Sequence, residues 1–164
     1  MDLSASVIPL SHRAEVPAHS PLDDWERLMR RAASAMHLQQ PRMALACQRQ
    51  ALALVTEMAL EPPLGREDDC AAAWVVSHLN LAELAQEAGD PAESGRLLCA
   101  AHSTLLRWMG DPACAPALRQ AAPRHARETL AALLRHAAAY GAPADAEVTR
   151  LVEADVPWPS MRPH

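Results

Sequence analysis

The chain of 164 residues contains no phenylalanine and no lysine, and isoleucine occurs only once. Because all 15 basic residues are arginine, catalysis through a lysine Schiff base, a lysine general base or a phosphate-loop lysine is excluded. Half of the residues are hydrophobic and alanine dominates them, while no alternating run of β-branched residues occurs. This composition predicts an all-α protein of a single domain, and it is typical of GC-rich bacterial genomes.

Sequence motifs of catalysis and cofactor binding are also missing. The chain has no GxSxG, no glycine-rich phosphate loop, no HExxH and no EF-hand loop. The formal net charge is −5, so no overall basic field is available for nucleic acid. We therefore expect a protein that is not an enzyme, holds no cofactor and does not bind nucleic acid.

The four cysteines form no CxxC pair and match no zinc module. We expect four reduced thiols, at Cys47, Cys70, Cys99 and Cys114. Cys99 and His102 lie one helical turn apart and are the only weak candidates for a metal site. A metal- or haem-handling protein that uses its scattered histidines and cysteines is accordingly the alternative function.

Signals for membranes and export are missing as well. No apolar run reaches the length needed to cross a bilayer, and residues 1–16 have neither a basic start nor a signal-peptide core. These observations predict a cytoplasmic protein that does not associate with a membrane.

What the sequence does contain is a helical hairpin at residues 74–109. Apolar and small residues recur there at spacings of three and four on both sides of the turn Gly89-Asp90-Pro91. Glycine takes the left-handed cap conformation cheaply, Asp90 is a suitable N-cap, and proline fits the first helical position. So short a turn makes the two helices antiparallel neighbours, and we expect Leu81 and Leu98 to pack between them.

The hairpin recurs along the chain. Gln40-Pro41 lies 50 residues before Asp90-Pro91, and Gly141 lies 52 residues after Gly89. The pattern predicts about six helices in three antiparallel hairpins within residues 21–154, between a flexible arm (1–20) and an irregular proline-rich tail (155–164) that contains Trp158. Pro123 is expected to kink or restart the fifth helix near Ala122.

The central hairpin resembles the tetratricopeptide repeat. The family pattern has a large residue, leucines and small residues on the two helices and a Gly-Asp turn between them. In HLNLAELAQEAGD and the helix that follows it, these positions are occupied by His78, Leu81, Ala82, Ala85, Gly89, Asp90, Ser94, Leu98 and Ala101. The resemblance implies a right-handed superhelix whose concave face, formed by the first helix of each repeat, binds peptides. A closed helical bundle is the alternative fold.

The same resemblance suggests where a partner would bind. Asn80 matches a position at which some repeats hold a peptide carboxylate, although Val76 replaces the lysine of that clamp. Arg30 and Ala132 are the equivalents of Asn80 in the other two units. We therefore expect a scaffold that binds a protein or peptide, or forms a homodimer, and that draws acidic groups to its arginines. The expected binding residues are Arg30, Asn80, Glu83, Arg127 and Arg135.

Overall fold

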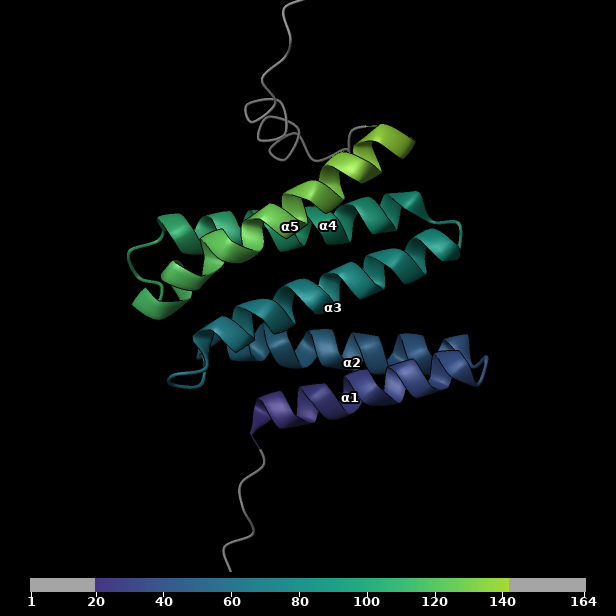
Figure 1. Cartoon of the computed structure of the whole chain (residues 1–164), viewed down its shortest axis with the longest axis horizontal. Coiled ribbons are helices and arrows are strands. Elements are labelled where there is room, and N and C mark those ends of the chain that lie inside the picture. The colour runs from purple at the N-terminus through teal and green to yellow at the C-terminus, as the bar shows by residue number, and fades with distance from the viewer. Residues whose placement is uncertain (1–19, 142–164) are drawn as a thin grey trace, which may run out of the picture.

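The computed structural model describes residues 20–141, which form five α-helices and no strand (Figure 1). The all-α prediction is therefore confirmed for this part of the chain. The predicted sixth helix, the N-terminal arm and the tail with Trp158 lie outside the described residues. The helices are α1 (Pro21–His37), α2 (Pro41–Leu60), α3 (Glu67–Glu87), α4 (Pro91–Gly110) and α5 (Pro116–Tyr140).

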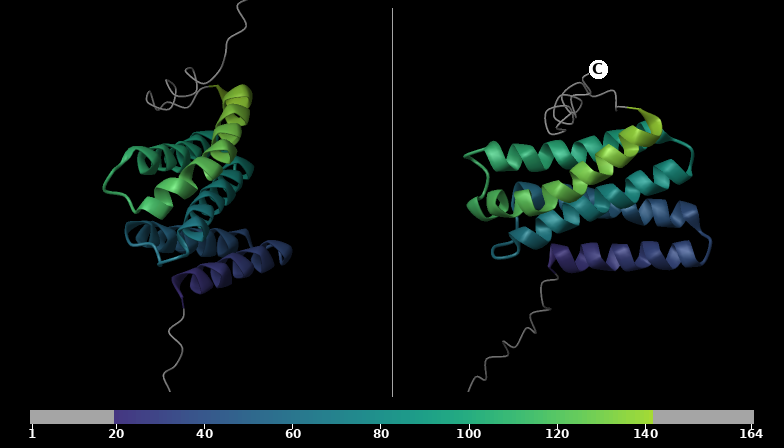
Figure 2. Two further views of the ribbon diagram at one scale, coloured as in Figure 1. Left: turned by 60° about the vertical axis from the view of Figure 1, so that its left-hand side comes forward. Right: turned by 45° about the horizontal axis from the view of Figure 1, so that its top comes forward.

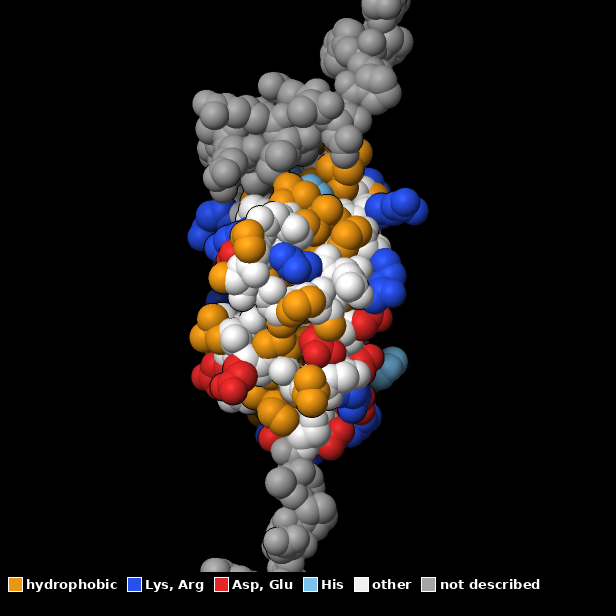
Figure 3. Space-filling view, turned by 90° about the vertical axis from the view of Figure 1, so that its left-hand side faces the viewer, with side chains coloured by type: hydrophobic (Ala, Val, Ile, Leu, Met, Phe, Trp, Pro, Cys, Tyr) orange, Lys and Arg blue, Asp and Glu red, His pale blue; other side chains and the backbone are white. Residues whose placement is uncertain are grey.

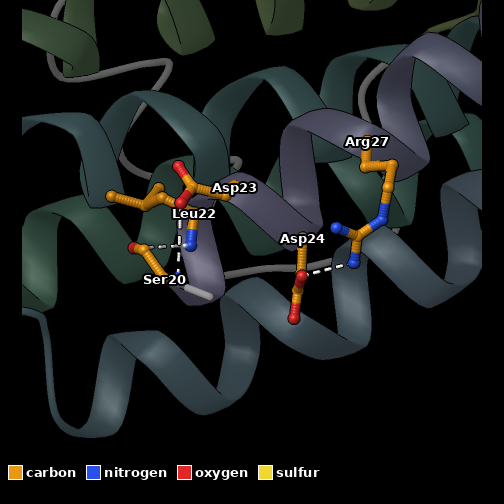
Figure 4. A network of polar contacts seen from close by, with 5 residues as sticks. All are labelled: Ser20, Leu22, Asp23, Asp24 and Arg27. Carbon is orange, nitrogen blue, oxygen red and sulfur yellow. Dashed lines mark hydrogen bonds and ion pairs between the residues drawn. The ribbon is translucent and has the colours of Figure 1, made fainter. Parts of the chain in front are cut away.

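The start of α1 is a capping box (Figure 4). The Ser20 side chain accepts a hydrogen bond from the backbone of Leu22, and the Asp23 carboxylate accepts one from the backbone N–H of Ser20 at 3.3 Å. These bonds satisfy amides that a helix leaves unpaired in its first turn. Asp24 and Arg27 form an ion pair one turn further on. Helix α1 thus begins at Pro21, the first residue of the predicted helical region.

The turn between α3 and α4 also follows the sequence. Gly89 has φ +79°, the left-handed conformation expected of it. The Asp90 carboxylate accepts a hydrogen bond from the backbone N–H of Glu93 at 2.9 Å, and Pro91 is the first residue of α4. The predicted cap therefore joins the two helices of the central hairpin.

Helix α5 is continuous through Pro123, so of the two predicted alternatives, a kink or a restart near Ala122, the restart does not occur. Proline lacks the N–H that would bond to the carbonyl four residues earlier, which here belongs to Arg119. Pro123 and Arg124 are both exposed, so water can reach the backbone on that side of the helix. The neighbouring Ala121 and Ala122 are fully buried, and their packing holds this part of α5 against the core.

Helices α1, α2 and α3 follow one another in chain order from one end of the molecule, and α4 and α5 pack together at the other end (Figures 1 and 2). Each helix packs against the next, and α3 in the middle also contacts both α1 and α5. As a result α1, α3 and α5 form consecutive walls of one face, which we call the inner face.

The main core lies where α2, α3, α4 and α5 meet, and tryptophans dominate it. Trp74 and Trp108 are buried with ring centroids 5.4 Å apart in an edge-on arrangement. The half-buried Trp25 of α1 packs against this core and donates a hydrogen bond from Nε1 to Ser77 Oγ at 2.9 Å. Trp25 thus connects α1 to the core around Trp74 and Trp108.

A second apolar cluster joins α3, α4 and α5, and it contains Leu98 and Leu133. Leu81 and Leu98 are both buried, as expected. The four cysteines all lie within the described residues, and no disulfide joins any two of them. Among the five helices none is long and apolar enough to cross a bilayer.

Candidate functional site

The inner face carries a hollow of about 330 Å³ between α1 and α3, which we call the first hollow. Its walls are mainly apolar on α1 and polar on α3, and α2 closes its floor. The residues that line it are Met29, Ala32, Ala33 and Met36 of α1, Ala44 and Gln48 of α2, and Asn80, Glu83, Leu84 and Glu87 of α3.

A second hollow, of about 660 Å³, lies on the other side of α3, between α3 and α5. Helix α4 closes its floor, and its lining is more polar. The residues are Leu79, Ala82, Glu83, Gln86 and Glu87 of α3, Ser94 and Leu98 of α4, and Ala132, Arg135, His136, Ala139 and Tyr140 of α5.

The two hollows are repeats of one another. Each residue that α1 and α2 contribute to the first hollow has a counterpart exactly 50 positions later in the second. The counterparts are Met29 and Leu79, Ala32 and Ala82, Ala33 and Glu83, Met36 and Gln86, Ala44 and Ser94, and Gln48 and Leu98. The internal repeat seen in the sequence is therefore also a repeat of cavity architecture, and Glu83 and Glu87 of α3 line both copies.

The lining residues of both hollows include side chains with a buried polar atom that has no hydrogen-bond partner among the described residues. The first hollow contains Gln48 Oε1, and the second contains Ser94 Oγ and His136 Nδ1. The three side chains are more than nine-tenths buried. A buried polar atom without a hydrogen bond costs about 1–3 kcal/mol, so each of these atoms favours a ligand that supplies one.

His136 sits against the backbone of α4. A Cβ atom added to Gly95 would lie 2.9 Å from His136 Nε2, so glycine at this position makes room for the imidazole. Gly95 therefore lies against α5. Burial lowers the pKa of His136, which keeps the ring neutral at neutral pH, and the ring packs 5.1 Å from that of Tyr140.

Three of the predicted binding residues lie on this surface. Asn80 and Glu83 line the first hollow, and Glu83 and Arg135 line the second. Arg30 and Arg127 line neither hollow. Arg30 is highly exposed and pairs with Glu26 at 3.4 Å, and no helix precedes α1 in the described chain to form a hollow with it. Arg127 is exposed about two turns before the segment of α5 that forms the second hollow.

The candidate metal ligands Cys99 and His102 are both buried in α4. His102 Nδ1 lies 2.8 Å from the Thr129 hydroxyl, which connects α4 to α5. Within residues 20–141 no three histidine, cysteine, aspartate or glutamate side chains form a group that could hold a metal ion.

A third depression, of about 580 Å³, was not anticipated, and we call it the outer groove. It lies between α2 and α4, over the C-terminal half of α3. Its lining includes Leu45, Leu52, Leu84 and Leu97, with arginines on the α2 side and acidic residues on the α3 and α4 side. Elsewhere, the end of the molecule in Figure 3 mixes apolar, basic and acidic side chains. The highly exposed Leu60 is the last residue of α2, and the highly exposed Leu64 lies in the connection between α2 and α3.

Comparison with known proteins gives one family. A family described as a protein of unknown function (DUF2753) matches residues 23–157. The chain belongs to this family. No curated protein and no solved structure matches it. The match spans all five helices of the structure except the first residues of α1, so both hollows lie within the part that the DUF2753 family defines.

Proposed function

We propose that this protein is a non-enzymatic scaffold that binds an extended peptide segment of a partner protein along its inner face. The observation that carries the proposal is the pair of repeated hollows, each with a buried polar atom that has no partner. A peptide supplies a donor and an acceptor at every residue and therefore suits such a row of atoms.

The proposal includes a tetratricopeptide-like, right-handed array rather than a closed bundle. Two features support it. Each helix packs against the next, with alternate helices α1, α3 and α5 in contact along one face. The residues that carry the resemblance also belong to the α3–α4 hairpin, whose turn has the expected cap. In such an array the inner face is the concave one.

Charge and shape favour a peptide over other ligands. The lining of the second hollow combines Glu83 and Glu87 with Arg135, and that of the first includes the amide of Asn80. A surface of mixed charge with amide groups suits a polypeptide better than a nucleic acid, which needs a basic surface. Because Glu83 and Glu87 line both hollows, one bound segment can cross α3 and occupy them together.

The test uses a library of random dodecapeptides displayed on phage, selected against the full chain, with affinities of the enriched peptides measured by fluorescence polarisation. Two variants then fill the hollows from exposed wall positions, Ala33→Trp in the first and Ala139→Trp in the second. Matched controls place tryptophan at exposed alanines that line none of the three depressions, as Ala53→Trp and Ala131→Trp.

We expect the hollow-filling variants to lower peptide affinity at least about tenfold, while the controls keep it and all four variants fold. Failure to enrich any peptide would overturn the proposal. Enriched peptides that bind all four variants equally would show that the binding surface lies elsewhere, and the outer groove is then the next surface to alter.

A further inference from the structure

The charged residues that line the first hollow are all acidic. Its lining contains the carboxylates of Glu83 and Glu87 but no arginine and no histidine. Neither carboxylate forms an ion pair with another described residue. A ligand in this hollow therefore meets two carboxylates with no cationic side chain in the same lining.

Helix α3 adds to this negative potential. Glu83 and Glu87 lie in its last two turns, where the helix macrodipole favours cations, and its last turn has no basic residue. Two acidic groups at a helix C-terminus oppose the dipole, so a cation bound beside them is favoured by the side chains and by the helix together.

The floor of the first hollow supplies an independent observation. Gln48 is 8% exposed, and its Oε1 atom accepts no hydrogen bond from any described group. An amide oxygen can only accept, so its partner must be a donor. A cationic donor is therefore the kind of group that suits both this oxygen and the two carboxylates of the same lining.

The apolar walls define the rest of the ligand. Met29, Met36 and Leu84 face the same space. Lysine and arginine have a long aliphatic stem that covers apolar surface and a cationic head that reaches polar groups, whereas a small cation lacks the stem. A volume of about 330 Å³ holds roughly ten waters at the density of liquid water, which is ample room for one such side chain.

The second hollow differs from the first in the charge of its lining. Arg135 belongs to its lining, together with Ser94 and His136. The negative charge of Glu83 and Glu87 is therefore balanced in part on that side of α3, and the preference for a cation belongs to the first hollow alone.

From these contacts we infer that the first hollow is a specificity pocket for a lysine or arginine side chain of the bound peptide. This inference rests on the proposed function and deepens it. The sequence led us to expect arginines that attract acidic groups of the ligand. Arg30 and Arg127 line neither hollow, and the first hollow instead favours a basic group of the ligand.

The experiment compares peptide selections on three full-length chains: the wild type, Glu83→Gln with Glu87→Gln, and Glu57→Gln with Glu61→Gln. The second pair is a matched control, because it removes the same charge from exposed positions outside the three depressions. We expect lysine and arginine to be enriched at one peptide position on the wild type and the control, and this enrichment to vanish on the first pair.

Peptides that are enriched without a basic residue, or a basic preference that survives the first pair, would overturn the inference and leave the proposed function standing. A library that yields no peptide at all would overturn both.

A further variant, Gln48→Met, separates recognition from folding. It removes the unsatisfied oxygen from a buried site while keeping a side chain of similar length. We expect a melting temperature equal to or above that of the wild type, together with at least about tenfold weaker binding of the enriched basic peptides. Unchanged binding of those peptides would overturn the role of Gln48, and with it the pocket.

Discussion

Gln39 adopts the same left-handed backbone conformation as Gly89, which follows it by 50 residues, with φ +55° and +79°. The hydrogen bonds match as well. The N–H of each residue donates to the carbonyl three residues earlier, and the N–H of the next residue donates to the carbonyl five residues before it, at 2.8–3.0 Å. The two hairpins therefore end their first helices in the same way, although only the second has the glycine that this conformation favours.

This equivalence predicts that Gln39→Gly stabilises the protein. Left-handed backbone costs a residue with a Cβ atom about 1 kcal/mol relative to glycine, so the free energy of unfolding should rise by about that amount. Urea denaturation measures the change. Gly89→Gln should lower the stability by a similar amount, and a less stable Gln39→Gly variant would contradict the assignment of this turn.

Leu98 joins the second apolar cluster to the floor of the second hollow, so it should be costly to truncate. It is 5% exposed and packs with Leu133 and small residues of three helices. Leu98→Ala should destabilise the protein by about 2–5 kcal/mol, whereas Leu38→Ala, at a residue that is 67% exposed, should cost far less. Thermal melts of the two variants test this, and equal losses would place the core elsewhere.

The buried thiol of Cys70 should resist alkylation in the native protein. Burial, with a smaller contribution from Glu67, raises its pKa to about 11, so only about one molecule in a thousand carries the reactive thiolate at pH 8. Mass spectrometry after treatment with iodoacetamide should find Cys70 unmodified until denaturant is added. Rapid modification of Cys70 under native conditions would contradict this packing.

Two buried histidines should make the protein less stable in mild acid. Burial lowers the pKa of both His78 and His136, so the unfolded chain binds protons more readily than the folded one. Their contribution to stability is complete above the unfolded pKa of about 6.5 and is lost as the pH falls from there through the lowered folded values.

Melting temperatures recorded between pH 7.5 and pH 5 test this expectation. The decrease towards pH 5 should shrink in the variant His78→Gln with His136→Gln and persist in the variant of the exposed His37→Gln. If the melting temperature of the double variant falls towards pH 5 as much as that of the wild type, the effect belongs to other groups.

The helices were predictable from sequence because their signals are local. Ser20-Pro21 and Gly89-Asp90-Pro91 mark where helices begin and end. The spacing of apolar residues that includes Leu81 and Leu98 shows which faces of the central hairpin are buried. Pro123 left open whether the fifth helix continues, because a local rule does not register the packing that buries Ala121 and Ala122 of α5.

The residues that line the two hollows were only partly predictable. Asn80 and Glu83 were found because they stand beside the packed stripe of their helix. Gln48 and His136 were missed, since a buried polar residue looks like part of the stripe until its missing hydrogen bond is known. Arg30 has the position of Asn80 in the repeat but lines neither hollow, because a hollow also needs a preceding helix.

Nuclear magnetic resonance of the isotope-labelled full chain tests the central claim most directly. Backbone amide shifts are recorded with and without a peptide enriched in the phage selection. Binding on the inner face predicts that the largest changes fall at Ala33, Asn80, Glu83 and Ala139, on both sides of α3. Changes concentrated instead at Leu45, Leu52 and Leu97, with the inner face unaffected, would place the ligand in the outer groove and contradict the account.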